Sequence, residues 1–182
     1  MAKNFLVTGR PGVGKTTCLK RLAEILVSRG VAVGGMITLE VREAGVRKGF
    51  EVVDLLSGRR GVLASTGAGE GPRVGRYVVN LRDLEDVGVS AVRNAVDKAS
   101  VVIIDEIGPM ELLSESFKEA VTSALNSEKP VAASIHERAR ENPFGRSVLE
   151  RRDVELIPLS LANRERVPAE LARKIANLLA RQ

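Results

Sequence analysis

The chain contains a glycine-rich segment whose residue types and spacing suit phosphate binding. It fits the pattern G-x-x-x-x-G-K-[ST] at every fixed position, with the residues Gly9, Arg10, Pro11, Gly12, Val13, Gly14, Lys15 and Thr16. Glycines let successive backbone N–H groups point at one anion, and a following helix adds the positive end of its dipole. We therefore expect Lys15 to reach the β- and γ-phosphates and Thr17 to donate to the α-phosphate. The Thr16 hydroxyl is the expected ligand of Mg²⁺.

A second group of residues places two carboxylates at the end of an apolar run. Residues 101–104 are Val-Val-Ile-Ile, and Asp105 and Glu106 follow directly, which is typical of a Walker B motif. Asp105 is predicted to hold Mg²⁺, either directly or through a water. Glu106 is predicted to orient and deprotonate a water near the γ-phosphate. The expected catalytic residues are therefore Lys15 and Glu106, and the expected metal ligands are Thr16 and Asp105.

Further polar residues could contact the nucleotide, but each could instead have only an ordinary structural or solvated role. Ser134 ends the next apolar run and could sense the γ-phosphate, or could simply be a serine at a strand end. His136, two residues later, could contact the nucleotide or be merely solvated. Arginines between residues 59 and 76 are expected to be solvated, although one could serve as an arginine finger.

Nucleotide binding by itself leaves several activities open. A small GTPase would need an Asn-Lys-x-Asp guanine reader, which the sequence lacks. The Leu-Ser-Gly string at residues 56–58 lies far upstream of Asp105 and lacks the Gly-Gln continuation of transporter ATPases. A nucleotide or nucleoside kinase is an alternative, with residues 138–152 as a candidate lid. The pair of Asp105 and Glu106 nevertheless favours the activation of a water over that of a phosphate acceptor.

The framework that must hold these residues alternates between strand and helix patterns. An apolar run at residues 5–8 precedes the glycine-rich segment, and an apolar stripe over residues 15–29 predicts a helix. Continuous apolar runs at residues 101–104 and 131–135 predict parallel strands that are buried on both faces. This alternation predicts an α/β fold with a mainly parallel sheet.

One stretch departs from this alternation. Residues 40–80 contain short β-type runs separated by glycines and arginines, which predicts an antiparallel β insertion. Just before it, Gly34 and Gly35 are expected to interrupt a strand. The insertion is too short for a separate domain, so we predict a single domain over residues 1–182.

The composition limits the class of protein. The 182 residues are 44% hydrophobic and 28% charged, as in ordinary globular domains. No apolar run approaches the roughly 20 residues of a membrane span, and the first residues lack the apolar region of a signal peptide. We therefore expect no membrane partner and a cytoplasmic location. A single cysteine and a single histidine exclude a disulfide framework and a histidine-rich metal centre within one chain.

The charge balance bears on the partner. The net charge of +5 suggests an anion, either a nucleotide or nucleic acid. Only 3% of the residues are aromatic, which argues against a protein that stacks single-stranded bases. Nucleic acid is therefore not favoured, and an NTP-switched RNA-binding module is kept as a second alternative. The scarcity of aromatic side chains also predicts loose discrimination among nucleobases.

Several longer strings resemble the nucleoside-triphosphatase family first described from thermophiles, whose vertebrate members are called cancer-related nucleoside-triphosphatase. The resemblance covers nearly the whole chain. The strings stand at residues 8–17, 34–36, 40–43, 47–53, 74–79, 104–112 and 163–164. Asp-Glu-Ile-Gly-Pro-Met-Glu-Leu within the sixth string is far more specific than a P-loop alone, although Pro109 stands where relatives can have lysine.

The resemblance implies a fold and an activity. The expected fold is a P-loop NTPase with helices on both faces of the sheet. The implied activity is slow, Mg²⁺-dependent hydrolysis of ATP, GTP, CTP, UTP and TTP to the diphosphate and phosphate. It further implies that Asn163 and Arg164 lie near the base or the phosphates. The sequence does not fix the oligomeric state and is compatible with a monomer.

Overall fold

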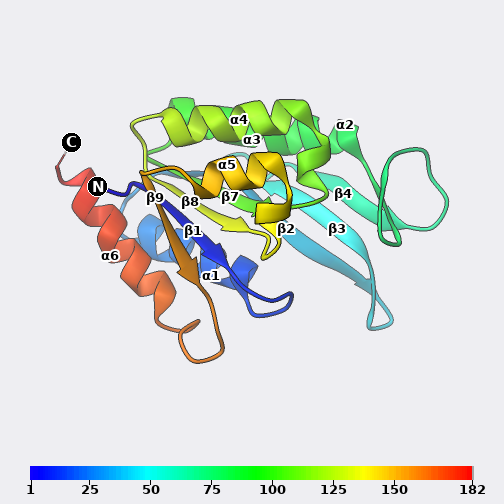
Figure 1. Cartoon of the computed structure of the whole chain (residues 1–182), viewed down its shortest axis with the longest axis horizontal. Helices are drawn as coiled ribbons and strands as arrows, with labels where there is room; N and C mark the ends of the chain where they lie inside the picture. Colours follow the sequence, from blue (N-terminus) through cyan, green and yellow to red (C-terminus); the bar gives the residue numbers. More distant parts are fainter. Residues whose placement is uncertain (182) are drawn as a thin grey trace.

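A nine-stranded mixed sheet forms the centre of the computed structural model, which describes residues 1–181 (Figure 1). The order across the sheet is β5-β6-β4-β3-β2-β7-β8-β1-β9. The strands are β1 (Asn4–Thr8), β2 (Val33–Glu43), β3 (Val46–Asp54), β4 (Arg60–Thr66), β5 (Arg73–Val74), β6 (Tyr77–Val79), β7 (Val101–Ile107), β8 (Val131–Ile135) and β9 (Val154–Pro158). The five strands from β2 to β9 in this order pair in parallel, which confirms the predicted parallel centre.

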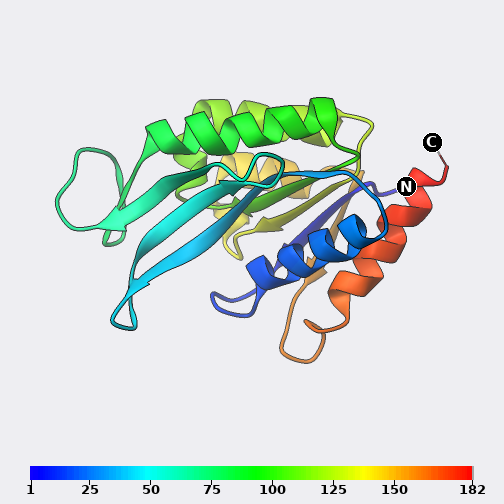
Figure 2. The same ribbon diagram turned by 180° about the vertical axis from the view of Figure 1, so that it is seen from behind.

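Helices cover both faces of this sheet, as the fold prediction requires. Figure 2 shows α1 and α6 together on one face and α3 and α4 on the other. The helices are α1 (Lys15–Ser28), α2 (Leu81–Asp83), α3 (Ser90–Lys98), α4 (Glu115–Asn126), α5 (Pro143–Leu149) and α6 (Val167–Leu179). A π-helical segment (Leu84–Val89) joins α2 to α3, and 3₁₀ turns occupy Glu111–Leu113 and Ala139–Glu141. None of the helices in residues 1–181 is long and apolar enough to cross a membrane.

The central strand β7 shows why the apolar run must be continuous. Val102 and Ile104 belong to the core beneath α3 and α4, whereas Val101 and Ile103 belong to the core beneath α1 and α6. All four are fully buried. A strand that is buried on both faces needs an apolar side chain at every position, so the prediction for residues 101–104 is confirmed.

The antiparallel part of the sheet grows out of β2. Residues 33–36 of β2 pair in parallel with β7, and residues 36–43 pair antiparallel with β3. β3, β4, β6 and β5 continue the antiparallel pattern, which confirms the predicted insertion. The expected interruption at Gly34 and Gly35 was wrong, because β2 passes through both residues. Gly35 instead has φ +113°, and a Cβ there would lie 1.9 Å from the Ile103 carbonyl oxygen, so glycine permits close approach of β7.

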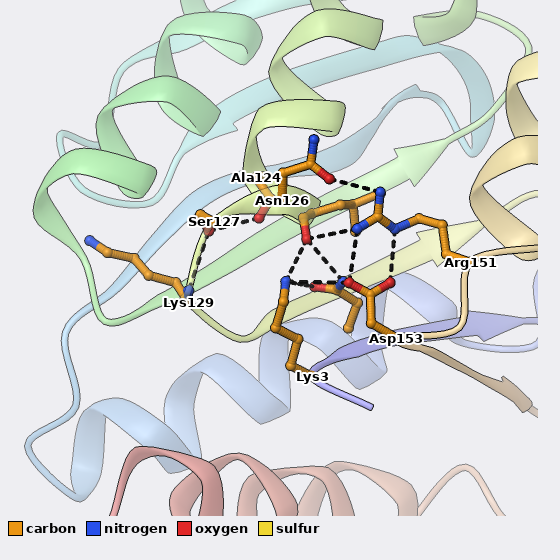
Figure 3. A network of polar contacts seen from close by, with 9 residues as sticks. Lys3, Ala124, Asn126, Ser127, Lys129, Arg151 and Asp153 are labelled. Atoms are coloured by element: carbon orange, nitrogen blue, oxygen red, sulfur yellow. Dashed lines mark hydrogen bonds and ion pairs between the residues drawn. The ribbon is translucent and has the colours of Figure 1, made fainter. Parts of the chain in front are cut away.

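A polar network ties together the other edge of the sheet, where β1 and β9 begin (Figure 3). Arg151 donates to both carboxylate oxygens of Asp153, at 2.9 and 2.8 Å, and to the Leu125 carbonyl oxygen at 3.1 Å. The Lys3 ammonium lies 3.7 Å from Asp153 and also donates to the Leu125 carbonyl. These cations stabilise the C-terminal end of α4, where carbonyl groups lack helical partners.

Replacement of Asp153 by asparagine is expected to lower the free energy of unfolding by about 1–2 kcal/mol at pH 7, the scale of a charge-assisted hydrogen bond. The hydrogen bond from Arg151 holds the pKa of Asp153 below its ordinary 3.8. A lowered pKa stabilises the fold above pH 3.8 and ceases to do so as the pH falls through the lower value. Urea unfolding of both proteins should therefore differ at pH 7, and the difference should shrink as the pH is lowered below 3.8. A difference that stays equal over this range would contradict this role.

Candidate active site

The glycine-rich loop joins the end of β1 to the start of α1. Gly14 is the N-cap of α1 with φ +110°, and no side chain caps the first turn. That turn contains no acidic residue. The free N–H groups and the positive end of the helix dipole therefore make this end of α1 electropositive. The Lys15 ammonium folds back over the loop and donates to the carbonyl oxygens of Gly9 at 2.9 Å and Arg10 at 3.4 Å. The loop therefore has the backbone geometry and the charge to receive a phosphate.

Asp105 is the meeting point of four elements at the carboxyl edge of the parallel strands. Its side chain is 1% exposed at the end region of β7. The carboxylate accepts hydrogen bonds from the hydroxyls of Thr16 on α1 at 2.8 Å, Thr38 on β2 at 3.0 Å and Ser134 on β8 at 2.6 Å. The Thr38 backbone N–H adds a fourth at 3.2 Å. The carboxylate is therefore fixed in one orientation beside Thr16.

Glu106 turns toward the loop lysine instead. Its Oε2 atom lies 3.9 Å from the Lys15 Nζ, and the two side chains are 25% and 10% exposed. Burial raises the pKa of Glu106 to about 7, with a smaller increase from Asp105, while the charge of Lys15 opposes the rise. A carboxyl group with a pKa near neutrality can accept and release a proton at physiological pH. The geometry thus pairs the loop ammonium with a carboxyl group that can exchange a proton near neutral pH.

A third carboxyl group, that of Glu111, is buried behind this pair. Glu111 opens the 3₁₀ turn after β7 and is 4% exposed. Burial raises its pKa well above the ordinary value, and the charge of Glu106 raises it further. Both effects favour the neutral form of the Glu111 carboxyl over the ionised form.

The candidate residues Ser134, His136 and Thr17 differ in burial and in hydrogen bonding. Ser134 is fully buried and donates to Asp105, so it orients that carboxylate. His136 is partly exposed, and its Nδ1 atom accepts from the Arg138 backbone N–H at 3.2 Å. Burial and the charge of Lys15 lower the pKa of His136, which indicates a neutral ring on the side of the loop. Thr17 is exposed in the first turn of α1.

Asn163 and Arg164 lie in the segment between β9 and α6. Asn163 shapes this segment itself, because its side chain accepts from the Ser160 N–H at 2.8 Å and donates to the Pro158 carbonyl at 2.9 Å. Arg164 reaches the glycine-rich loop, where its Nη1 donates to the Val13 carbonyl at 3.5 Å. The structure therefore brings Arg164 to the loop, while Asn163 builds the turn that presents it.

Sequence reasoning had assigned no part in the site to Thr38 or Glu111. Thr38 follows an apolar stretch on β2, and only the pairing of β2 with β7 brings it to Asp105. An acidic residue within the otherwise apolar string Met-Glu-Leu-Leu at residues 110–113 is the signal that could have indicated Glu111. An ionisable group at such a position is usually paired or neutral.

Comparison with known sequences finds similarity over almost the whole chain. A family model described as NTPase matches residues 4–172. The chain is 62% identical over 180 residues to Nucleoside-triphosphatase THEP1 of Thermofilum pendens, covering 99% of each chain. It is 43% identical over 174 residues to Nucleoside-triphosphatase THEP1 of Methanosarcina acetivorans, covering 95% of this chain and 97% of the other.

Solved structures agree with this similarity. The crystal structure of THEP1 from the hyperthermophile Aquifex aeolicus superimposes with a TM-score of 0.82 at 29% identity, covering 94% of this chain and 98% of the other. The solution structure of a human cancer-related nucleoside triphosphatase gives a TM-score of 0.81 at 37% identity, covering 96% and 97%. The matched region includes the glycine-rich loop and the end of β7.

Proposed function

The chain belongs to the NTPase family, and on that premise we propose that it hydrolyses the terminal anhydride of nucleoside triphosphates with Lys15 and Glu106 as catalytic residues. The family resemblance expected from the sequence is confirmed, and with it the P-loop NTPase fold. The observation that carries the proposed chemistry is the approach of Glu106 Oε2 to within 3.9 Å of the Lys15 Nζ. One group binds the phosphate that is cleaved, and the other stands where it can accept a proton.

The loop residues bind the triphosphate in this proposal. The free N–H groups of the loop and of the first turn of α1 surround the β- and γ-phosphates, and Thr17 donates to the α-phosphate. Lys15 exchanges its contacts with the Gly9 and Arg10 carbonyls for contacts with phosphate oxygens. Arg164, at the Val13 carbonyl, lies against the loop where a nucleotide would extend.

The donor set beside the loop fits Mg²⁺. The Thr16 hydroxyl and the Asp105 carboxylate lie 2.8 Å apart, and both supply the hard oxygen atoms that Mg²⁺ prefers. Thr38 and Ser134 hold the carboxylate in place through their hydroxyls. When bound, the metal neutralises charge on the phosphate oxygens.

Hydrolysis then needs one proton acceptor. Glu106 orients a water and takes its proton while the water oxygen bonds to the γ-phosphorus. The bond from that phosphorus to the β–γ bridging oxygen breaks, which leaves the nucleoside diphosphate and inorganic phosphate. Lys15 stabilises the negative charge that develops on the transferred group.

We further propose broad base specificity with slow turnover. The sequence contains no tryptophan, and the single tyrosine, Tyr77, lies in the antiparallel part of the sheet between Arg47 and Arg76. No stacking platform of tryptophan or tyrosine is therefore supplied to distinguish bases.

The kcat/KM values for ATP, GTP, CTP, UTP and TTP are expected to agree within about tenfold, since one or two unspecific contacts discriminate by no more than about 1.4 kcal/mol. Steady-state phosphate release across the five triphosphates, with the matching diphosphates as controls, measures this. A preference above a hundredfold for one base would contradict it. Absence of phosphate release from every triphosphate would overturn the proposed hydrolase activity.

The kinase alternative is not favoured. Its candidate lid, residues 138–152, folds into a 3₁₀ turn and α5, which contribute the buried residues Ala139 and Val148 to the core. Arg138 pairs with Glu141, and Arg146 donates to the Arg140 carbonyl. These arginines are engaged within their own segment.

A further inference from the structure

We infer that Gly108 is a positioning residue for Glu106, because the absence of a side chain at residue 108 leaves the space that the Glu106 carboxylate occupies beside Lys15. The inference rests on the proposed role of Glu106 in hydrolysis. Gly108 is the first residue after β7 and is buried, two positions beyond Glu106.

The distances leave no room for a side chain at this position. A Cβ on Gly108 would lie 2.5 Å from Glu106 Oε1 and 3.1 Å from both Cδ and Cγ of Glu106. Non-bonded carbon atoms keep about 3.5–4.0 Å apart, so a methyl group and the carboxylate cannot occupy these positions together. The three nearest atoms all belong to this one glutamate.

Backbone conformation does not account for the glycine. Ten glycines between Gly9 and Gly75 have positive φ, where other residues are strained, but Gly108 is not among them. An alanine could therefore adopt the backbone of residue 108. What it would displace is the end of the Glu106 side chain.

The Glu106 carboxylate lies between Gly108 and Lys15. Its Oε1 atom faces Gly108, and its Oε2 atom lies 3.9 Å from the Lys15 Nζ. A methyl group at residue 108 would push Oε1 away and rotate the whole carboxylate relative to Lys15. Because a glutamate side chain has three rotatable bonds, this displacement costs little stability, whereas a shift of about 1 Å in a catalytic group can cost about a hundredfold in rate.

The test is Gly108→Ala alone and combined with changes at Glu106. Gly108→Ala is expected to lower kcat for ATP hydrolysis at least tenfold, with KM changed less than about threefold and the fold retained by circular dichroism. In a Glu106→Gln background, the added loss should be below about twofold, since no base remains to be displaced. A Glu106→Asp background shortens the side chain by one methylene, so the same change should cost less there than in the native protein.

Gly69→Ala is the matched control. A Cβ at Gly69 would make only ordinary contacts, the nearest at 3.5 Å from Val78, and φ is not positive. Its kcat should equal that of the native protein.

The outcomes separate this inference from the proposed function. Native kcat in Gly108→Ala, together with an inactive Glu106→Gln, overturns the positioning role alone. An equal loss in the Glu106→Gln background also overturns it, because Gly108 would then act independently of Glu106. Native turnover in Glu106→Gln overturns the proposed base and the inference with it. Should Gly108→Ala fail to fold, Glu106→Asp must restore folding, and failure to do so overturns the inference.

Discussion

Replacement of Glu106 by glutamine is expected to lower kcat for phosphate release by about 10²–10⁴-fold, the usual contribution of a general base. Glutamine has almost the same shape, so the space between Gly108 and Lys15 stays filled. It cannot accept a proton at neutral pH. The affinity for the Mg²⁺–nucleotide complex should change little, because Lys15, Thr16 and the loop N–H groups are untouched.

The same substitution should not destabilise the fold. Burial disfavours the ionised form of Glu106 and raises its pKa to about 7, so the charged carboxylate is a cost that a neutral amide removes. The free energy of unfolding at pH 8 should therefore be equal to or higher than that of the native protein. A loss of activity with retained stability would separate a chemical role from a structural one.

Steady-state phosphate release and equilibrium titration with a fluorescent nucleotide measure the two effects separately. Glu119→Gln is the matched control, since it makes the same chemical change on the exposed face of α4, where Glu119 pairs with Arg93 at 3.7 Å. Its kcat and affinity should equal those of the native protein. Unchanged turnover in Glu106→Gln would exclude Glu106 as the base.

The sequence predicts those parts of the site whose residues lie close together along the chain. The spacing from Gly9 to Thr16 and the order of Asp105 and Glu106 after an apolar strand are local patterns, so they are visible without a structure. The same holds for the alternation of strands and helices, because burial on one or two faces sets the hydrophobic pattern of each element.

The parts that the sequence could not predict depend on which strands become neighbours. Thr38 reaches Asp105 only because β2 is placed beside β7, although 67 residues separate them. Ser134 lies near the expected strand end, but its hydrogen bond to the Asp105 carboxylate depends on the packing of β8 beside β7. The raised pKa of Glu111 likewise follows from burial that only the folded chain provides.

Gly35 illustrates the limit of local rules, and it carries the largest expected effect on stability. Two consecutive glycines within a β-type pattern suggest an interruption, yet here the strand continues and Gly35 lets two backbones approach. A Cβ on Gly35 would lie 1.9 Å from the Ile103 carbonyl oxygen and 2.8 Å from the Ile103 nitrogen. Both are main-chain atoms of the fully buried Ile103 in β7, and a main chain has no flexible end that could move aside.

Gly35→Ala is therefore expected to lower the free energy of unfolding by more than about 4 kcal/mol, at the upper extreme for single substitutions. Gly30→Ala is the control that isolates the cause. Gly30 also has positive φ, +77°, but a Cβ there would meet nothing within 4 Å. The free energy of unfolding of Gly30→Ala should fall only by the cost of placing alanine in the left-handed conformation, about 1–2 kcal/mol.

Urea unfolding of the two variants measures the difference. If both lose the same free energy, backbone conformation and not the contact with Ile103 explains Gly35. If only Gly35→Ala is severely destabilised, the spacing of β2 and β7 is fixed by the missing side chain. That spacing also brings Thr38 to Asp105. The glycine at residue 35 would then be a requirement of the proposed metal site as well as of the fold.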